Sequence, residues 1–288
     1  MTARFNSVVR VDTVVFEKEI QQRYTQLYGA DVVRSCFIPL KRTLRVNTLR
    51  ITAHQLRERL EKQRFELSAG MLKDSFVIER ERKHLGATLE HLLGYFYIQE
   101  LTSMIPPRWL NPLPTDVVLD MSAAPGGKTT YLSEIMKNQG TIVAIDTDKR
   151  KNEAMLANLE RMGTRNVTFF NFDALQIKDL NMTFSKILLD APCSASGIVM
   201  KDKNVARKLT LSYIKKYAEK QKSLLSRAAD VLGEGGVITY STCSIDPLEN
   251  EGVTDYAQSV LGLTLKRKKQ FLPNPNGLVG FYVGELKK

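Results

Sequence analysis

The stretch Val117-Val-Leu-Asp-Met-Ser-Ala-Ala-Pro-Gly-Gly-Lys-Thr-Thr-Tyr131 decides the fold. It begins with an apolar run too short for a helix, continues through small residues, a proline and two glycines, and ends in residues typical of a helix start. Strand, tight turn and helix form the first unit of a nucleotide-binding α/β sheet. Small side chains let a ligand approach the backbone, and the helix start offers unpaired N–H groups. We therefore expect a nucleoside-bearing ligand at this turn.

Two more specific nucleotide-binding motifs are excluded at this turn. Ser122 stands where a phosphate-binding loop requires glycine, and Gly126 and Gly127 are adjacent, which does not fit G-x-G-x-x-G. Asp146 lies about twenty residues beyond the turn, where a carboxylate binds ribose hydroxyls. The stretch alone leaves S-adenosylmethionine, NAD and an ordinary glycine-rich turn open.

The chain beyond residue 111 alternates between short apolar runs and helical patterns, which predicts an α/β fold with a Rossmann-like parallel sheet. The expected strands are 117–120, 141–146, 167–170, 186–190 and 237–240, with a final strand at 278–286. The expected helices are 148–162, 211–232 and 249–261. Ligands bind at the carboxyl ends of such strands, where four acidic residues stand: Asp120, Asp146, Asp173 and Asp190.

The N-terminal part predicts a separate small α+β domain. Residues 1–40 are expected to be partly helical, from the spacing of Val14, Val15, Ile20, Tyr24 and Leu27, with Gly29 as the helix end. A strand within 41–50, a helix capped by Thr52, and strands at 65–67 and 75–78 resemble an RRM-like RNA-binding sheet. The expected RNA contacts are Arg42, Arg45, Asn47 and Arg50, although a solvated strand face is the alternative for the arginines.

Four prolines between residues 106 and 114 indicate a rigid connection. We therefore predict two domains, an N-terminal RNA-binding region at 1–110 and a ligand-binding domain at 111–288.

The composition narrows the functional classes. Hydrophobic residues make up 43% and charged residues 25%, and no apolar run approaches the ~20 residues of a membrane span. The first residues contain no apolar signal core, so we expect a cytoplasmic protein without membrane contact. The net charge of +11 favours an RNA partner, with general solubility as the alternative. The three cysteines and three histidines do not have metal-ligand spacing, so no metal is expected.

Two cysteines follow neighbouring predicted strands. Cys193 lies in Asp190-Ala-Pro-Cys-Ser194 and Cys243 in Tyr240-Ser-Thr-Cys-Ser244, so the sheet should bring both thiols into one cleft. A thiolate that adds to carbon 6 of a cytosine activates carbon 5 for methylation, and a base must then remove the proton from carbon 5. Buried inert thiols are the alternative for each cysteine. A dehydrogenase would need no such pair.

These motifs together resemble the Nop2/Sun family of RNA cytosine-5 methyltransferases, most closely its small archaeal tRNA members. The resemblance covers roughly residues 40–288 and rests on Asp120-Met-Ser-Ala-Ala-Pro-Gly-Gly-Lys-Thr129 and the two cysteine motifs, with Leu44-Arg-Val-Asn-Thr-Leu49, Gly94, Gln99 and Glu249-Asn-Glu251 as weaker matches. It implies a class I methyltransferase fold. It also implies that Cys243 is the nucleophile and that Cys193 assists product release. Asp190 and Lys128 are candidate assisting groups.

The resemblance also implies S-adenosylmethionine as cofactor. The implied cofactor residues are Ser122, Ala123, Ala124, Pro125, Gly126, Gly127, Lys128, Asp146, Lys151, Asp173 and Asp190. RNA is the implied substrate, with tRNA favoured and ribosomal RNA open; an NAD-dependent oxidoreductase and an inactive RNA-binding scaffold are the more distant alternatives. The sequence departs from the family pattern at Ser122, at Ala195-Ser-Gly197, and in residues 272–281, which contain no histidine.

Overall fold

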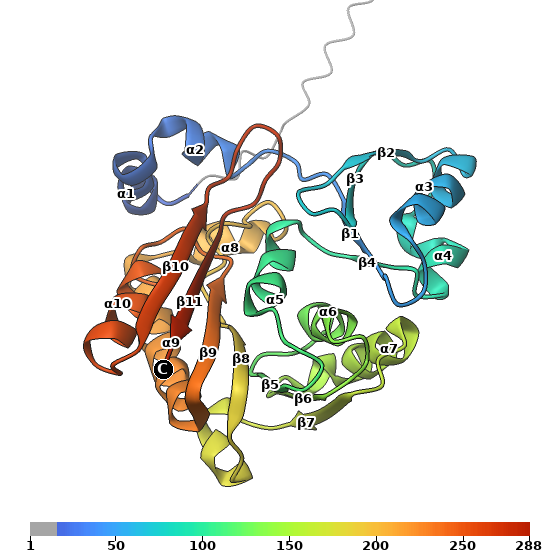
Figure 1. Ribbon diagram of the computed structural model, residues 1–288. Helices are drawn as coiled ribbons and strands as arrows, with labels where there is room; N and C mark the ends of the chain where they lie inside the picture. Colours follow the sequence, from blue (N-terminus) through green and yellow to red (C-terminus); the bar gives the residue numbers. More distant parts are fainter. Residues whose placement is uncertain (1–15) are drawn as a thin grey trace, which may run out of the picture.

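The computed structural model describes residues 16–288, which form two sheets (Figure 1). The larger sheet has seven strands in the order β10-β11-β9-β8-β5-β6-β7. The strands β5 to β9 pair in parallel, while β11 and β10 are antiparallel. Their bounds are β5 (Val117–Asp120), β6 (Thr141–Asp146), β7 (Val167–Asn171), β8 (Phe184–Asp190), β9 (Leu232–Thr242), β10 (Thr264–Phe271) and β11 (Phe281–Lys287). The predicted α/β sheet is confirmed.

Helices cover both faces of the large sheet. On one face, α9 (Leu211–Val231) and α10 (Glu251–Ser259) pack on the largest hydrophobic cluster, which includes Ile187, Ile238 and Leu225. On the other face, α5 (Ile105–Leu110) and α6 (Gly127–Ile135) pack over Val118 and Leu188. The further elements around this sheet are the 3-10 turns Thr102–Met104, Lys149–Lys151 and Ala174–Leu180 and the helices α7 (Asn152–Met162) and α8 (Lys203–Lys208).

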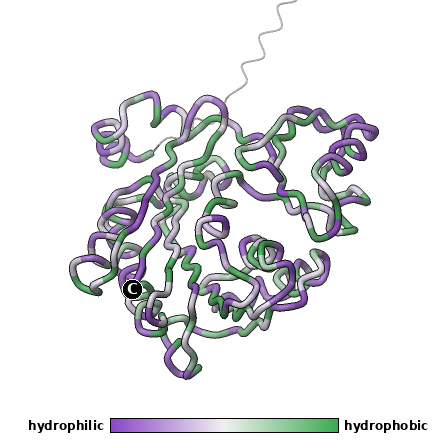
Figure 2. The backbone as a smooth tube through the Cα atoms, in the orientation of Figure 1, coloured by the Kyte–Doolittle hydropathy of each residue, from purple (hydrophilic) through white to green (hydrophobic). Residues whose placement is uncertain are grey.

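The edge strand β10 does not follow the expected apolar alternation. Its sequence Lys266-Arg-Lys-Lys269 is a continuous charged run, and all four of these residues are exposed. Exposed cations on an edge strand discourage pairing with another chain. Figure 2 shows this hydrophilic edge beside the hydrophobic central strands. The sequence therefore predicted the final strand but not the one that pairs with it.

The smaller sheet has the order β2-β3-β1-β4, and all of its pairs are antiparallel. Its strands are β1 (Thr43–Val46), β2 (Glu66–Ala69), β3 (Ser75–Arg80) and β4 (Phe96–Ile98). This is the order of a split β-α-β arrangement. Thr52 caps α3 (Ala53–Lys62) in a capping box with Gln55, as predicted, and α3 buries Leu56 and Leu60 against one face of the sheet. The 3-10 turn Leu85–Ala87 and α4 (Leu89–Leu92) precede β4.

The structure corrects two parts of the predicted domain division. Pro106 and Pro107 lie in the first turn of α5, where a missing N–H is tolerated, and this helix packs on the large sheet instead of forming a connection. The helices α1 (Lys18–Tyr28) and α2 (Ala30–Ser35) also pack away from the small sheet. They bury Ile20 and Tyr24 against Ile214 and Ile245 of the large domain. Gly29 ends α1 as predicted, whereas Val14 and Val15 lie outside the described residues.

Candidate functional site

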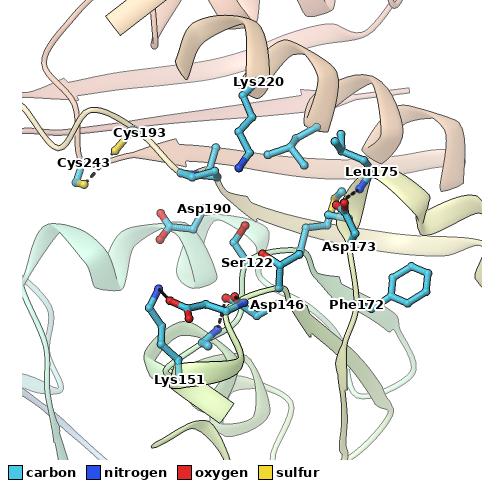
Figure 3. A pocket seen from close by; sticks show the side chains of 18 residues that line it. Ser122, Asp146, Lys151, Phe172, Asp173, Leu175, Asp190, Cys193, Lys220 and Cys243 are labelled. Atoms are coloured by element: carbon cyan, nitrogen blue, oxygen red, sulfur yellow. Dashed lines mark hydrogen bonds and ion pairs between the residues drawn. The ribbon is translucent and has the colours of Figure 1, made fainter. Parts of the chain in front are cut away.

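A cavity of about 570 Å³ opens at the carboxyl ends of the parallel strands (Figure 3). Eight of the predicted site residues line it: Ser122, Ala124, Asp146, Lys151, Asp173, Asp190, Cys193 and Cys243. The other predicted turn residues do not line the cavity: Ala123, Pro125, Gly126, Gly127 and Lys128. The topology of the sheet thus gathers into one site residues that lie up to 121 positions apart.

The turn after β5 is held by hydrogen bonds to two carboxylates. The hydroxyl of Thr129 donates to Asp120 over 2.7 Å, and the backbone N–H of Ala124 donates to Asp146 over 3.0 Å. Asp120 is fully buried, and this burial raises its pKa to about 6 despite the hydrogen bonds from Thr129 and Ser122. Asp146 also accepts from the N–H of Asp148 over 2.8 Å, which fixes the carboxylate at the cavity wall.

The charged side chains that line the cavity indicate which cofactor it can hold. Four carboxylates line the cavity, from Asp146, Asp148, Asp173 and Asp190, against two ammonium groups, from Lys151 and Lys220. The resulting negative balance favours a positively charged sulfonium and ribose hydroxyls, and it disfavours the two phosphates of a dinucleotide. The volume lies within the range of small-ligand sites. The residues present therefore fit S-adenosylmethionine better than NAD.

The two thiols meet at one end of this cavity. The Sγ atoms of Cys193 and Cys243 are 3.1 Å apart, as the predicted strand order required. The contact with Cys243, together with burial, raises the pKa of Cys193 well above its usual range. Cys193 is therefore a protonated thiol at neutral pH, and it can donate its proton to a thiolate on Cys243.

An ion pair stands beside the thiols. The ammonium of Lys128 lies 2.6 Å from one carboxylate oxygen of Asp190, and Ser241 donates to the other over 2.7 Å. Burial lowers the pKa of Lys128, but the attraction of Asp190, Asp120 and Cys243 outweighs it and leaves this pKa raised. Lys128 thus carries a positive charge next to Cys243, the thiol that the family resemblance implies as the nucleophile.

A buried carboxylate that was not among the predicted site residues joins the two cysteine loops. Glu249 accepts the N–H of Ser194 over 2.8 Å, the hydroxyl of Ser244 over 2.6 Å, and the amide of Gln221 over 3.0 Å. Ser194 and Ser244 each follow one of the cysteines. Burial raises the pKa of Glu249 against these hydrogen bonds. The motif Glu249-Asn-Glu251 is visible in the sequence, but the hydrogen-bond partners of Glu249 are brought to it only by the fold.

The loop after Cys193 is closely packed against the end of the chain. The N–H of Gly197 donates to the carbonyl of Cys243 over 3.0 Å, and the N–H of Gly280 donates to the carbonyl of Gly197 over 2.9 Å. A Cβ atom at Gly197 would lie 2.4 Å from the carbonyl oxygen of Gly280, so only glycine fits there. Ala195, in the segment that departs from the family pattern, has φ 60°, a conformation that favours glycine.

Helix α1 supports the loop after Cys243. The guanidinium of Arg23 lies 2.8 Å from the buried carboxylate of Asp246, and Tyr28 donates to the carbonyl of Ile245 over 2.6 Å. The first described helix is therefore part of the framework of the active site.

The structure contradicts two of the predicted RNA contacts. Arg45 is fully buried, with its guanidinium 2.6 Å from the carbonyl of Gly127 and 3.3 Å from the carboxylate of Glu134. Asn47 is buried and donates to the carbonyls of Gly94 and Met162. Arg45, which was expected to meet RNA, instead docks β1 onto α6 through Gly127, Thr130 and Glu134.

Arg42 and Arg50 remain exposed, so RNA contacts by these two stay predictions. Within residues 16–288, no group of three or more His, Cys, Asp or Glu side chains is placed to hold a metal ion. None of the described helices combines the length and apolar character needed to cross a membrane.

Comparison with known proteins agrees with this geometry. Residues 107–263 match the model of the family described as 16S rRNA methyltransferase RsmB/F. Ribosomal RNA small subunit methyltransferase F of Vibrio campbellii is 39% identical over 81% of this chain and 50% of its own length. The tRNA (cytosine(49)-C(5))-methyltransferase of Pyrococcus abyssi is 35% identical over 88% of this chain and 82% of its own. This chain thus spans about half the length of the methyltransferase F relatives that it matches.

Two solved structures share the fold over nearly the whole chain. A methyltransferase homolog from Pyrococcus horikoshii has a TM-score of 0.87 at 36% identity and covers 96% of both chains. NSun6 from the same organism, solved with the S-adenosylmethionine analogue SFG, has a TM-score of 0.89 at 25% identity and covers 95% of this chain and 98% of its own.

Proposed function

Since this chain belongs to the family of the 16S rRNA methyltransferases RsmB/F, we propose that it transfers a methyl group from S-adenosylmethionine to carbon 5 of a cytosine in RNA. The single observation that carries the proposal is the pair of thiols 3.1 Å apart at the end of a cavity whose charge suits this cofactor. Covalent activation of a pyrimidine requires a nucleophile that adds to carbon 6, and a second thiol at hydrogen-bond distance can assist its later departure.

Cys243 is the proposed nucleophile. Its thiolate forms a bond to carbon 6 of the cytosine, and the displaced electron pair makes carbon 5 nucleophilic. The ammonium of Lys128 is close enough to Cys243 for electrostatic attraction, and the sulfur of Cys193 lies at hydrogen-bond distance from that of Cys243. The bound cofactor supplies an electrophilic methyl group to carbon 5.

Asp190 is the proposed partner of the cytosine ring. Its carboxylate lines the cavity next to both thiols and can accept a hydrogen bond from the exocyclic amino group, an interaction specific to cytosine among the pyrimidines. Lys128, 2.6 Å away, balances the negative charge that the ring gains when the thiolate adds. After methyl transfer, a base removes the proton from carbon 5, the bond to carbon 6 breaks, and its electron pair returns to Cys243. Cys193 is placed to assist this departure.

The proposed cofactor contacts follow the wall of the cavity. Asp146 would hold the ribose hydroxyls, and the backbone of Ser122 and Ala124 would lie against the ligand because their side chains are small. Asp173 and Lys151 stand across the cavity from the thiols in Figure 3 and would contact the nucleoside end.

We propose tRNA as the substrate, and the cytoplasm as the place of action. One relative that this chain matches over most of both lengths, from Pyrococcus abyssi, is named a tRNA methyltransferase. Ribosomal RNA is the second candidate, because the methyltransferase F relatives reach a slightly higher identity over half of their length.

The test uses unmodified transcripts of tRNA and of 16S ribosomal RNA with labelled S-adenosylmethionine. Methyl groups should appear on carbon 5 of cytosine in tRNA. Transfer to ribosomal RNA alone would identify the second candidate as the substrate. Transfer to neither RNA, or to another atom, contradicts the proposed function.

A further inference from the structure

A row of side chains on α9 leads from the cofactor cavity past the thiols. Tyr213, Tyr217, Lys220 and Leu224 are spaced by four, three and four residues, which places them along one side of the helix. Lys220 and Leu224 line the cavity, and Figure 3 shows the Lys220 side chain reaching into it from the helix. Tyr217 and Tyr213 continue the row beyond the cavity, on a part of the helix that cofactor binding does not use.

Hydrogen bonds hold this side of α9 next to the cysteine loop. Gln221, the residue after Lys220, donates over 2.9 Å to the carbonyl of Pro192, which precedes Cys193. It also donates to Glu249, which holds both cysteine loops. Tyr217 lies one helical turn before Gln221 and therefore on the same side of α9. This side of α9 thus faces the loop that carries Cys193.

The two tyrosines differ in how they pack. The ring of Tyr213 packs against the hydrophobic cluster under α1, whereas Tyr217 belongs to none of the hydrophobic clusters of the described residues. Their rings meet edge to face with centroids 4.9 Å apart, and their hydroxyl oxygens are 3.4 Å apart. Tyr213 thus anchors Tyr217, whose half-exposed ring is free to meet a ligand. The exposed Lys216 and Lys220 flank it, and neither is part of an ion pair within residues 16–288.

The chemistry of the reaction supplies a ligand for such a ring. A thiolate can reach carbon 6 only when the cytosine has left the base stack, and the neighbouring base then loses its stacking partner. Aromatic side chains commonly replace that partner in single-stranded RNA, with cations on the adjoining phosphates.

We propose that Tyr217 stacks on an unpaired base next to the target cytosine, that Tyr213 holds it in place, and that Lys216 and Lys220 bind the adjoining phosphates. This inference rests on the proposed function and extends it to a second RNA subsite. It predicts that the substrate is single-stranded at the target and at one neighbouring nucleotide.

The experiment measures methylation of the RNA accepted by the wild-type chain. Tyr217→Ala should raise KM for the RNA roughly 5- to 100-fold, the range of one lost base–aromatic stack, with KM for S-adenosylmethionine unchanged. Tyr217→Phe should behave as wild type. Tyr256→Ala is the matched control, because Tyr256 is also half-buried and bonded through its hydroxyl, to Ser226, but lies on α10. It should leave both constants unchanged.

Two further measurements separate stacking from a structural role. On RNA with abasic sites on both sides of the mapped cytosine, wild type and Tyr217→Ala should have the same KM. In a second measurement, 2-aminopurine replaces the base beside the cytosine, and stacking on Tyr217 of the wild-type protein should quench the fluorescence of the 2-aminopurine. This measurement requires no protein variant. The inference is overturned if Tyr217→Ala matches Tyr256→Ala, if its defect persists on abasic RNA, or if no flanking 2-aminopurine is quenched. Absence of methylation by the wild-type chain on any RNA would instead overturn the proposed function, and this inference with it.

Discussion

At the scale of single residues, the two active-site thiols should fail in different ways when removed. Cys243→Ala cannot form the bond to carbon 6, so methylation and covalent adduct should both vanish while RNA binding remains. Cys193→Ala should still attack but release slowly, because the sulfur 3.1 Å from the leaving thiol is gone. It should therefore accumulate as a protein–RNA conjugate, visible as a shifted band on a denaturing gel.

The third cysteine provides the control for this experiment. Cys36 is buried in the cluster under α1, away from the cavity, so Cys36→Ala should methylate RNA without accumulating a conjugate. A conjugate in Cys243→Ala that is missing from Cys193→Ala would reverse the assignment.

The buried carboxyl of Asp120 should make stability depend on pH in an unusual direction. Its pKa rises from 3.8 in the unfolded chain to about 6 in the fold. Below pH 4 both states hold the proton, so the group contributes nothing. As pH rises from 4 to 6 the unfolded state ionises first, and the free energy of unfolding falls by roughly 3 kcal/mol before levelling off.

Urea denaturation at several pH values tests this behaviour. The difference between Asp120→Asn and wild type isolates this one group from the other carboxylates, and it should grow in favour of the variant between pH 4 and 6. If the curves of unfolding free energy against pH were parallel for the two proteins, Asp120 would already be ionised in the folded protein at low pH.

At the scale of secondary-structure elements, the contact between β1 and α6 depends on one buried ion pair. Burial lowers the pKa of Arg45 and raises that of Glu134, although their attraction opposes both effects. Arg45→Ala leaves Glu134 as an unpaired buried charge, which should cost about 3–5 kcal/mol of unfolding free energy. Arg42→Ala, on the exposed side, should cost less than about 1 kcal/mol.

A double variant separates the lost charge from the lost packing. Arg45→Met with Glu134→Gln removes both charges, so it should be more stable than Arg45→Ala in the same urea titration. Equal losses for Arg42→Ala and Arg45→Ala would mean that the pair does not join the two elements.

The same elements show what the sequence could predict. Four of the five parallel strands were predicted within two residues of their observed bounds because their short apolar runs carry a local signal, whereas β9 begins five residues before the predicted strand 237–240. The cleft between Cys193 and Cys243 followed from strand topology. The burial of Arg45 could not be predicted from the sequence. An arginine that alternates with apolar residues has the same local pattern whether solvent or another domain covers it. Glu249 and Arg23 gain their roles only from partners distant in sequence.

At the scale of the whole molecule, the excess of positive charge should govern the salt dependence of RNA binding. Lys268 and Lys269 are exposed on β10, whose end at Phe271 packs in the same cluster as Cys243. Replacement of both lysines by Ala should make the negative slope of log affinity against log salt concentration shallower by about 1.5. This change corresponds to the loss of two phosphate contacts.

The control for this prediction is a second pair of exposed lysines. Lys137 and Lys178 are exposed and neither lines the cavity, so their double Ala variant has the same net charge as the first double variant but should keep the wild-type slope. Equal slopes for the two double variants would mean that RNA binding depends on the net charge of the protein and not on where the lysines lie.

The contacts that hold the cysteine loops also bear on how the protein is made. Arg23 reaches Asp246 from near the start of the chain, and Gly280 meets Gly197 from near its end. A nascent chain that has grown to residue 250 already contains both thiols and the complete cofactor turn, but β11 and the close contact at Gly197 are still missing. Both thiols are thus synthesised before Gly280 and β11, and the loop after Cys193 gains its contact with Gly280 only when this later segment joins the sheet.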